Sequence, residues 1–169
     1  DLPVGQVGRV PQRDREPLPL GQTGDGRPDS AVTRVVRHRH LRKLAARLKV
    51  PVTPAGGASG VQGAANATCG GILLDLRSMT RVRNLDRRSL TCTVEAGMIV
   101  KTFEEQLNAQ ALGFTHYPAS AEWASIGGCV AARGSGVLST KYGTIQDHVL
   151  SAEVVLSDGD GVLLTTNQM

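Results

Sequence analysis

Three glycine-containing stretches of this 169-residue chain lie next to segments with the pattern of a strand or a helix. The chain holds 20 glycines, and four of them fall within the ten residues 54–63. The other two stretches are 117–128 and 132–147. Without a Cβ, the backbone can turn sharply and expose its N–H groups to another chain or a ligand. We therefore expect a fold whose loops are shaped for close backbone contact.

Length and composition limit the class of protein further. A chain of 169 residues is long enough to bury one hydrophobic core. Because only five residues are aromatic, we expect that core to consist of Ala, Val, Leu and Ile. Cys69, Cys92 and Cys129 have no CxxC spacing, so neither a disulfide scaffold nor a cysteine metal site is expected. No apolar stretch approaches the length of a membrane span, so we expect a soluble protein.

The positive charge belongs to the N-terminal part of the chain. Residues 1–50 carry a net charge of +6, whereas residues 51–169 carry −2. Nucleic-acid binding by the body is therefore not expected. Residues 1–28 hold five prolines without a periodic pattern, which indicates a disordered or poorly ordered lead-in before a domain at 29–169. The acidic residues of this lead-in argue against a transit peptide, and the compartment, cytoplasmic or mitochondrial, stays open.

Hydrophobic periodicity predicts a mixture of short strands and helices, hence an α+β class. In the second helix, Phe103, Leu107 and Ala111 are expected on the buried face. The expected helices are 41–48, 100–112 and 125–132, and the expected strands are 50–53, 72–76, 81–85 and 90–96, followed by a hairpin of 152–156 with 162–164.

The first glycine-rich stretch is the strongest local signal for a binding site. It follows a strand directly, and its N–H groups could converge on a phosphate or pyrophosphate, with the Ser59 hydroxyl as an additional donor. No Lys-Ser/Thr pair closes it as in a Walker loop, and G-x-G-x-x-G is not met. From the residues alone, a purely structural turn is an equal alternative.

The other two stretches add weaker signals. Ser125 is a candidate N-cap, and Gly127 and Gly128 would let another backbone or a flat ligand lie against the first helical turn. The third stretch places small and polar residues before a strand. Taken together, three such loops in one domain favour a nucleotide-sized ligand.

These segments resemble a known protein family in their residues and in their order along the chain. The residues that carry the resemblance are 94–97 (VEAG), 126–136 (IGGCVAARGSG), 141–150 (KYGTIQDHVL) and 153–159 (EVVLSDG). They are similar to the FAD-binding domain of the vanillyl-alcohol oxidase (PCMH-type) flavoproteins. Within that family they look most like the FAD-linked D-2-hydroxyacid dehydrogenases, which act on D-lactate or glycolate. The resemblance covers about residues 41–169.

This resemblance implies a PCMH-type FAD-binding domain of two small α/β subdomains, incomplete at its C-terminus. It implies that 54–60 cradle the FAD pyrophosphate and that 119–125 and 132–135 contact the rest of the cofactor. Family members that hold flavin covalently carry His where this chain has Ala58, so FAD is expected to bind non-covalently. The implied cofactor-binding residues are Pro54, Ala55, Gly56, Gly57, Ala58, Ser59, Gly60, Ala119, Ser120, Ser125, Gly127, Gly128, Ala132, Arg133, Gly134 and Ser135.

The resemblance also implies an enzyme that oxidises a D-2-hydroxy acid by hydride transfer to flavin N5. Two alternatives remain: the alkylglycerone-phosphate synthase branch, which uses FAD in ether-lipid synthesis, and a truncated, non-catalytic FAD-binding remnant. The family's substrate domain, with its catalytic residues, would lie beyond Met169, so this segment is expected to be inactive alone. The catalytic residues, the substrate, the electron acceptor and the oligomeric state are not indicated by the sequence.

The individual polar side chains are interpreted separately from the glycine-rich stretches. His116 is interpreted as an ordinary hydrogen-bonded residue, His148 as structural and Cys129 as packing. Asp147 is a candidate turn cap, and Glu122 could face either a ligand or solvent. We expect backbone N–H groups, not these side chains, to bind the cofactor.

Overall fold

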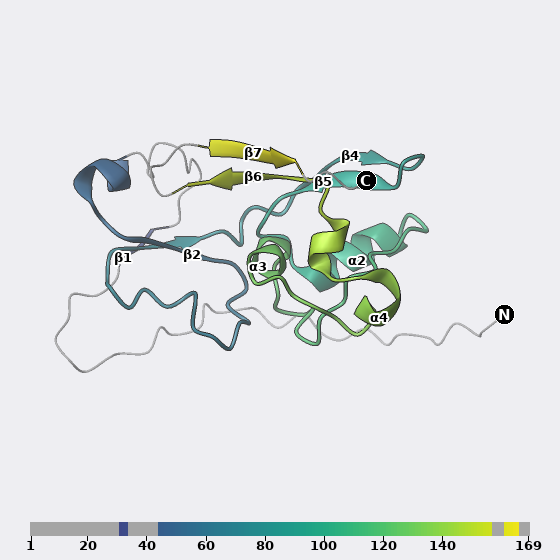
Figure 1. Ribbon diagram of the computed structural model, residues 1–169, viewed down its shortest axis with the longest axis horizontal. Helices are drawn as coiled ribbons and strands as arrows, with labels where there is room; N and C mark the ends of the chain where they lie inside the picture. Colours follow the sequence, from purple (N-terminus) through teal and green to yellow (C-terminus); the bar gives the residue numbers. More distant parts are fainter. Residues whose placement is uncertain (1–30, 34–43, 157–160, 166–169) are drawn as a thin grey trace.

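The computed structural model describes residues 31–33, 44–156 and 161–165, which form short helices and strands as the sequence predicts (Figure 1). The predicted lead-in 1–28 lies outside the described residues. Of the predicted helix 41–48, the described part, 44–48, is helical. The α+β class is confirmed.

A three-stranded parallel sheet carries the first glycine-rich stretch. Its strands are β1 (Ala31–Thr33), β2 (Val52–Ala55) and β3 (Ile72–Asp75), in the order β1-β3-β2. Strand β2 runs two residues further than the predicted 50–53 and includes Pro54. A proline, which has no N–H to donate, is tolerated there because β2 is an edge strand. The glycine-rich stretch therefore begins at the carboxyl end of β2.

Two antiparallel hairpins complete the strands. Strand β4 pairs with β5, and β6 pairs with β7 in the predicted C-terminal hairpin. Their bounds are β4 Val82–Asp86, β5 Thr91–Val94, β6 Ser151–Val155 and β7 Gly161–Thr165.

The helices are shorter than the sequence predicts. Helix α2 ends at Asn108, because the Leu112 N–H donates to the Leu107 carbonyl (3.0 Å) across a left-handed Ala111 (φ 57°). Ala111 is exposed and not on the buried face, so its predicted placement was wrong. Helix α3 agrees closely with the predicted 125–132. The helices are α2 Val100–Asn108, α3 Ile126–Ala131, α4 Ser139–Tyr142 and the 3-10 helix η1 Ile145–His148, and sequence reasoning did not foresee α4 and η1.

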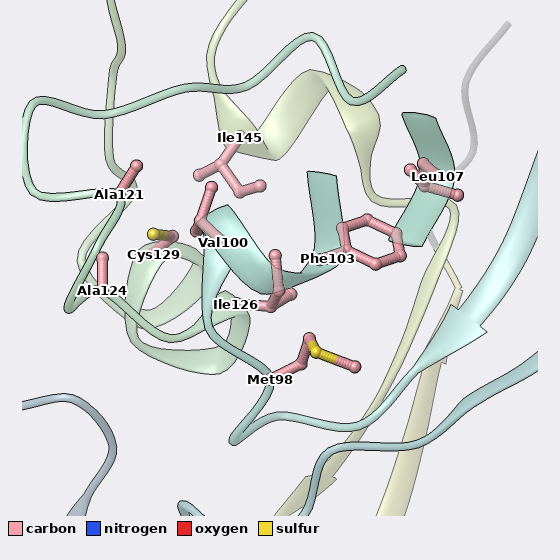
Figure 2. Close-up of a cluster of buried hydrophobic side chains, with 9 residues drawn as sticks. All are labelled: Met98, Val100, Phe103, Leu107, Ala121, Ala124, Ile126, Cys129 and Ile145. Carbon is pink, nitrogen blue, oxygen red and sulfur yellow. The ribbon is translucent and has the colours of Figure 1, made fainter. Parts of the chain in front are cut away.

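The described core lies between α2 and α3. Val100, Phe103 and Leu107 of α2 are buried at helical spacing, and Figure 2 shows their side chains gathered with Met98 and Ile126. Phe103 also meets Phe114 edge to face, with ring centroids 5.0 Å apart. This core supports the segment between the two helices, which carries part of the candidate site.

Truncating this core should destabilise the chain strongly. Leu107 is 5% exposed, so we expect Leu107→Ala to lower the free energy of unfolding by about 2–5 kcal/mol through lost burial and a residual cavity. The matched control is Leu90→Ala, because Leu90 is 73% exposed and its truncation should cost less than about 0.5 kcal/mol. Chemical denaturation measures both. Equal losses would contradict the placement of the core.

Candidate functional site

The loop of residues 56–60 leaves β2 with its N–H groups unused. Within the described part of the chain, none of these five N–H groups donates a hydrogen bond to the protein. Ala58 is left-handed (φ 52°), and residues 58–60 are exposed. Alternation of left- and right-handed backbone turns successive N–H groups toward one point, which is the geometry of anion-binding loops. The loop therefore combines free N–H donors with a left-handed residue at its exposed end.

The same loop is pressed against the segment that precedes α3. A Cβ on Gly56 would overlap the Ser125 hydroxyl, and a Cβ on Gly57 would overlap the carbonyl oxygen of Trp123. Two segments separated by more than 60 residues can therefore meet this closely only because these positions are glycine, backbone to backbone at Gly57 and against the Ser125 side chain at Gly56. This contact brings the first and second glycine-rich stretches together.

The N–H groups at the start of α3 already donate hydrogen bonds within the protein. The Ile126 and Gly127 N–H groups donate to the Met98 and Ala96 carbonyls (both 2.8 Å), and the Ser125 hydroxyl accepts from the Gly128 N–H (3.2 Å). The N-cap expected at Ser125 is confirmed. Of the two partners considered for the first turn, the backbone of Ala96 is the one that lies against Gly127. Free donors at the site therefore come from the loop rather than from this helix.

The third stretch folds back onto the second. The Val137 N–H donates to the Tyr117 carbonyl (3.0 Å), and a Cβ on Gly136 would overlap that carbonyl. Gly134 is held from both sides, because its N–H donates to the Cys129 carbonyl (2.9 Å) and its carbonyl accepts from the Ile145 N–H (3.1 Å). Segment 117–125 is thus the common support of the loop and of segment 132–136.

The remaining predicted site residues divide into two groups. Pro54 and Ala55 lie within β2, where the Ala55 carbonyl accepts from the Leu76 N–H (2.8 Å). The other residues lie at the surface or partly buried along the supporting segments, with Arg133 exposed and left-handed (φ 49°). Those other residues are Ala119, Ser120, Ala132, Arg133 and Ser135.

Four of the single polar residues have partners inside the protein. Glu122 pairs with Lys101 (2.6 Å), Asp147 completes a capping box with Thr144, and Cys129 packs in the core. The backbone N–H and hydroxyl of Thr144 hold the pKa of the Asp147 carboxyl below its usual value. His148 is also hydrogen-bonded, to Thr115 and Thr144. These side chains serve the structure.

His116 is different, and the interpretation as an ordinary hydrogen-bonded residue was wrong. Its side chain is fully buried, and neither ring nitrogen has a hydrogen-bond partner among the residues that the structure describes. Burial lowers the pKa of His116 below its usual value, and the nearby His148 lowers it further. No pattern in the sequence distinguishes such a histidine from a hydrogen-bonded one.

Metal and membrane features are not found in the part of the chain that is described. No group of three or more His, Cys, Asp or Glu residues there could hold a metal ion. None of the helices described combines the length and the apolar character that a membrane crossing requires.

Known proteins share both the sequence and the fold of this chain. It is 40% identical to the mitochondrial cytochrome D-lactate dehydrogenase of Arabidopsis thaliana over 68% of this chain and 20% of that protein. It is 33% identical to the alkyldihydroxyacetonephosphate synthase of Dictyostelium discoideum over 74% of this chain and 22% of that protein. The chain therefore spans about a fifth of the length of these relatives.

Solved structures agree with this result. An alkyldihydroxyacetonephosphate synthase matches with a TM-score of 0.69 at 30% identity, over 82% of this chain and 25% of the other. The 6-hydroxy-D-nicotine oxidase of Arthrobacter nicotinovorans shares the fold at a TM-score of 0.69 and 21% identity, over 81% of this chain and 30% of the other. The family model described as FAD binding domain matches residues 37–165. The chain belongs to this FAD-binding domain family, of the PCMH type, whose cofactor is FAD.

Proposed function

We propose that the loop of residues 56–60 binds the pyrophosphate of FAD through its backbone N–H groups. The unused donors of this loop are the observation that carries the proposal. A pyrophosphate offers several anionic oxygens, and converging N–H groups can solvate them without a positively charged side chain. Gly60 keeps this approach open, because a Cβ there would meet nothing within 4 Å.

We further propose that segments 119–125 and 132–135 contact the remainder of the cofactor. Segment 119–125 meets the loop at Gly56 and Gly57, and the third stretch packs on Tyr117 through Gly136, which supports this placement. FAD would be held without a covalent bond at Ala58, since a methyl group offers no atom for such a bond. Bound flavin supplies a hydride acceptor at N5.

For the reaction, we propose that the chain is the FAD-binding part of an oxidoreductase that oxidises a D-2-hydroxy acid such as D-lactate or glycolate. The 40% identity to a D-lactate dehydrogenase supports this candidate. A second candidate is an alkylglycerone-phosphate synthase, supported by 30% identity to a solved alkyldihydroxyacetonephosphate synthase. In both, the substrate domain would be a part of the enzyme that this segment does not include.

An isosteric pair of substitutions tests the pyrophosphate site. Ser59 is exposed at the loop, so Ser59→Asp adds a negative charge there with little effect on the fold, whereas Ser59→Asn changes almost the same volume without charge. We expect Ser59→Asp to raise the Kd for FAD at least about tenfold, and Ser59→Asn to change it far less. Flavin fluorescence titrations measure both constants.

Salt and riboflavin provide the controls for this pair. The difference between the two variants should shrink as salt concentration rises, because salt screens exposed charges. Riboflavin lacks the pyrophosphate and should bind both variants alike. Equal Kd values for FAD in the two variants would place the pyrophosphate elsewhere. A valine at Gly57 would be a poorer test, because its side chain would displace Trp123 whether or not flavin binds there.

Segment exchange separates the two candidate reactions. Residues 37–165 would replace the matching segment of the Arabidopsis D-lactate dehydrogenase and, separately, of the Dictyostelium synthase. We expect the dehydrogenase chimera to retain FAD and to oxidise D-lactate, since the segment must fit the surfaces of its own substrate domain. If only the synthase chimera is active, alkylglycerone-phosphate synthesis becomes the favoured function and D-2-hydroxy acid oxidation the second candidate.

A further inference from the structure

His116 has no part in the proposed cofactor contacts. An unpaired buried polar group costs about 1–3 kcal/mol, and a charged one costs more. With a fully buried side chain and two unpartnered nitrogens, the imidazole is accommodated only in its neutral form.

Among the described residues, no group accepts a hydrogen bond from either ring nitrogen of His116. Phe114 and His148 lie beside the ring, with centroids 6.0 and 6.4 Å away. His148 is itself fixed, because its Nδ1–H donates to the Thr144 carbonyl (2.8 Å) and its Nε2 accepts from the Thr115 hydroxyl (2.6 Å) in the neutral ring. A second positive charge there would add repulsion.

The other titratable groups on the neighbouring elements are hydrogen-bonded to other residues or uncharged. On η1, the Asp147 carboxylate is bonded to Thr144. On α2, the Glu104 carboxylate accepts from the Phe114 N–H (2.6 Å). Burial raises the pKa of the Cys129 thiol on α3, which therefore stays protonated at neutral pH. None of these groups forms a hydrogen bond with His116.

His116 also lies directly beneath segment 132–136. A Cβ added to Gly134 would lie 3.8 Å from Cε1 of His116, and Gly134 is bonded to both Cys129 and Ile145. Separation of segment 132–136 from this neighbourhood would expose the imidazole to water. Hydration of a protonated His116 by this route requires segment 132–136 to open.

We propose that His116 is an acid-sensitive switch: protonation of its buried ring opens segment 132–136 and releases the bound flavin. The flavin part rests on the proposed FAD site. The closed form binds FAD and excludes the proton, while the open form takes the proton and loses the flavin contacts. Each ligand therefore shifts the population away from the form that binds the other.

The sign of the pH dependence follows from the two forms. In the open form His116 titrates near its ordinary pKa of about 6.5, and in the closed form it titrates lower. Below about pH 6.5 the open form gains protons that the closed form does not, so closure weakens by up to about tenfold per pH unit. Once opening predominates, the Kd for FAD should rise by the same factor.

Two measurements on the same chain test the switch. The first follows amide hydrogen exchange of peptides spanning 132–137 without flavin, corrected for intrinsic exchange rates, from about pH 8 to about pH 5. The second measures the Kd for FAD over that range by flavin fluorescence. Both are repeated with His116→Gln and His116→Phe, whose side chains cannot titrate, and with His148→Gln, which keeps His116 but removes the neighbouring imidazole.

We expect wild-type protection at 132–137 and FAD affinity to fall together below about pH 6.5, and the two His116 variants to lose this dependence. His148→Gln should retain it and move it to higher pH, since the repulsion that lowers the pKa of His116 is gone. Equal pH dependence in wild type and a folded His116 variant overturns the switch.

Two further results separate the switch from the cofactor site. If wild type binds no FAD even near pH 8, the proposed FAD site is wrong, while the exchange measurement still decides whether His116 opens the segment. If neither His116 variant folds, ring-proton NMR of wild-type His116 replaces them. Titration of His116 near its ordinary pKa with no loss of protection at 132–137 would then overturn the proposal.

Discussion

The structure depends on backbone segments that touch without intervening side chains. The contact between Gly57 and the Trp123 carbonyl joins the end of the parallel sheet to the segment before α3, and Gly127 meets Ala96 in the same manner. Any Cβ at these two positions would force the segments apart. Close approach fixes where the loop of residues 56–60 lies, and the N–H groups of this loop donate no hydrogen bond within the described part of the chain.

The glycines of these stretches therefore differ in role: some allow close packing of the chain, and Gly60 lies in the proposed ligand-binding loop. Glycines that the sequence pattern associates with ligand approach, such as Gly57 and Gly127, accommodate other parts of the chain. Gly60 faces open space, and it belongs to the loop whose N–H donors are unused. The proposed pyrophosphate site therefore spans the whole loop, whose packed base at Gly56 and Gly57 holds its exposed end in place.

Sequence reasoning reached most of the strands and the capped start of α3, because alternation of apolar residues and a serine N-cap are local signals. It missed the end of α2, where a hydrogen bond from Phe114 to Glu104 and a left-handed Ala111 replace the helical continuation. It also missed the isolation of His116, which depends on residues far apart in the chain. The family resemblance supplied the cofactor, which glycine patterns alone left open between a binding loop and a structural turn.

The central claim is that FAD is bound by the N–H groups of residues 56–60. Two-dimensional NMR of the ¹⁵N-labelled chain, recorded as FAD is added, observes those groups directly. The account predicts saturable downfield shifts of the Gly56, Gly57 and Gly60 amide protons, with little change at the Gly127 amide, which is already bonded to Ala96. Saturable shifts elsewhere with unchanged loop signals would contradict it.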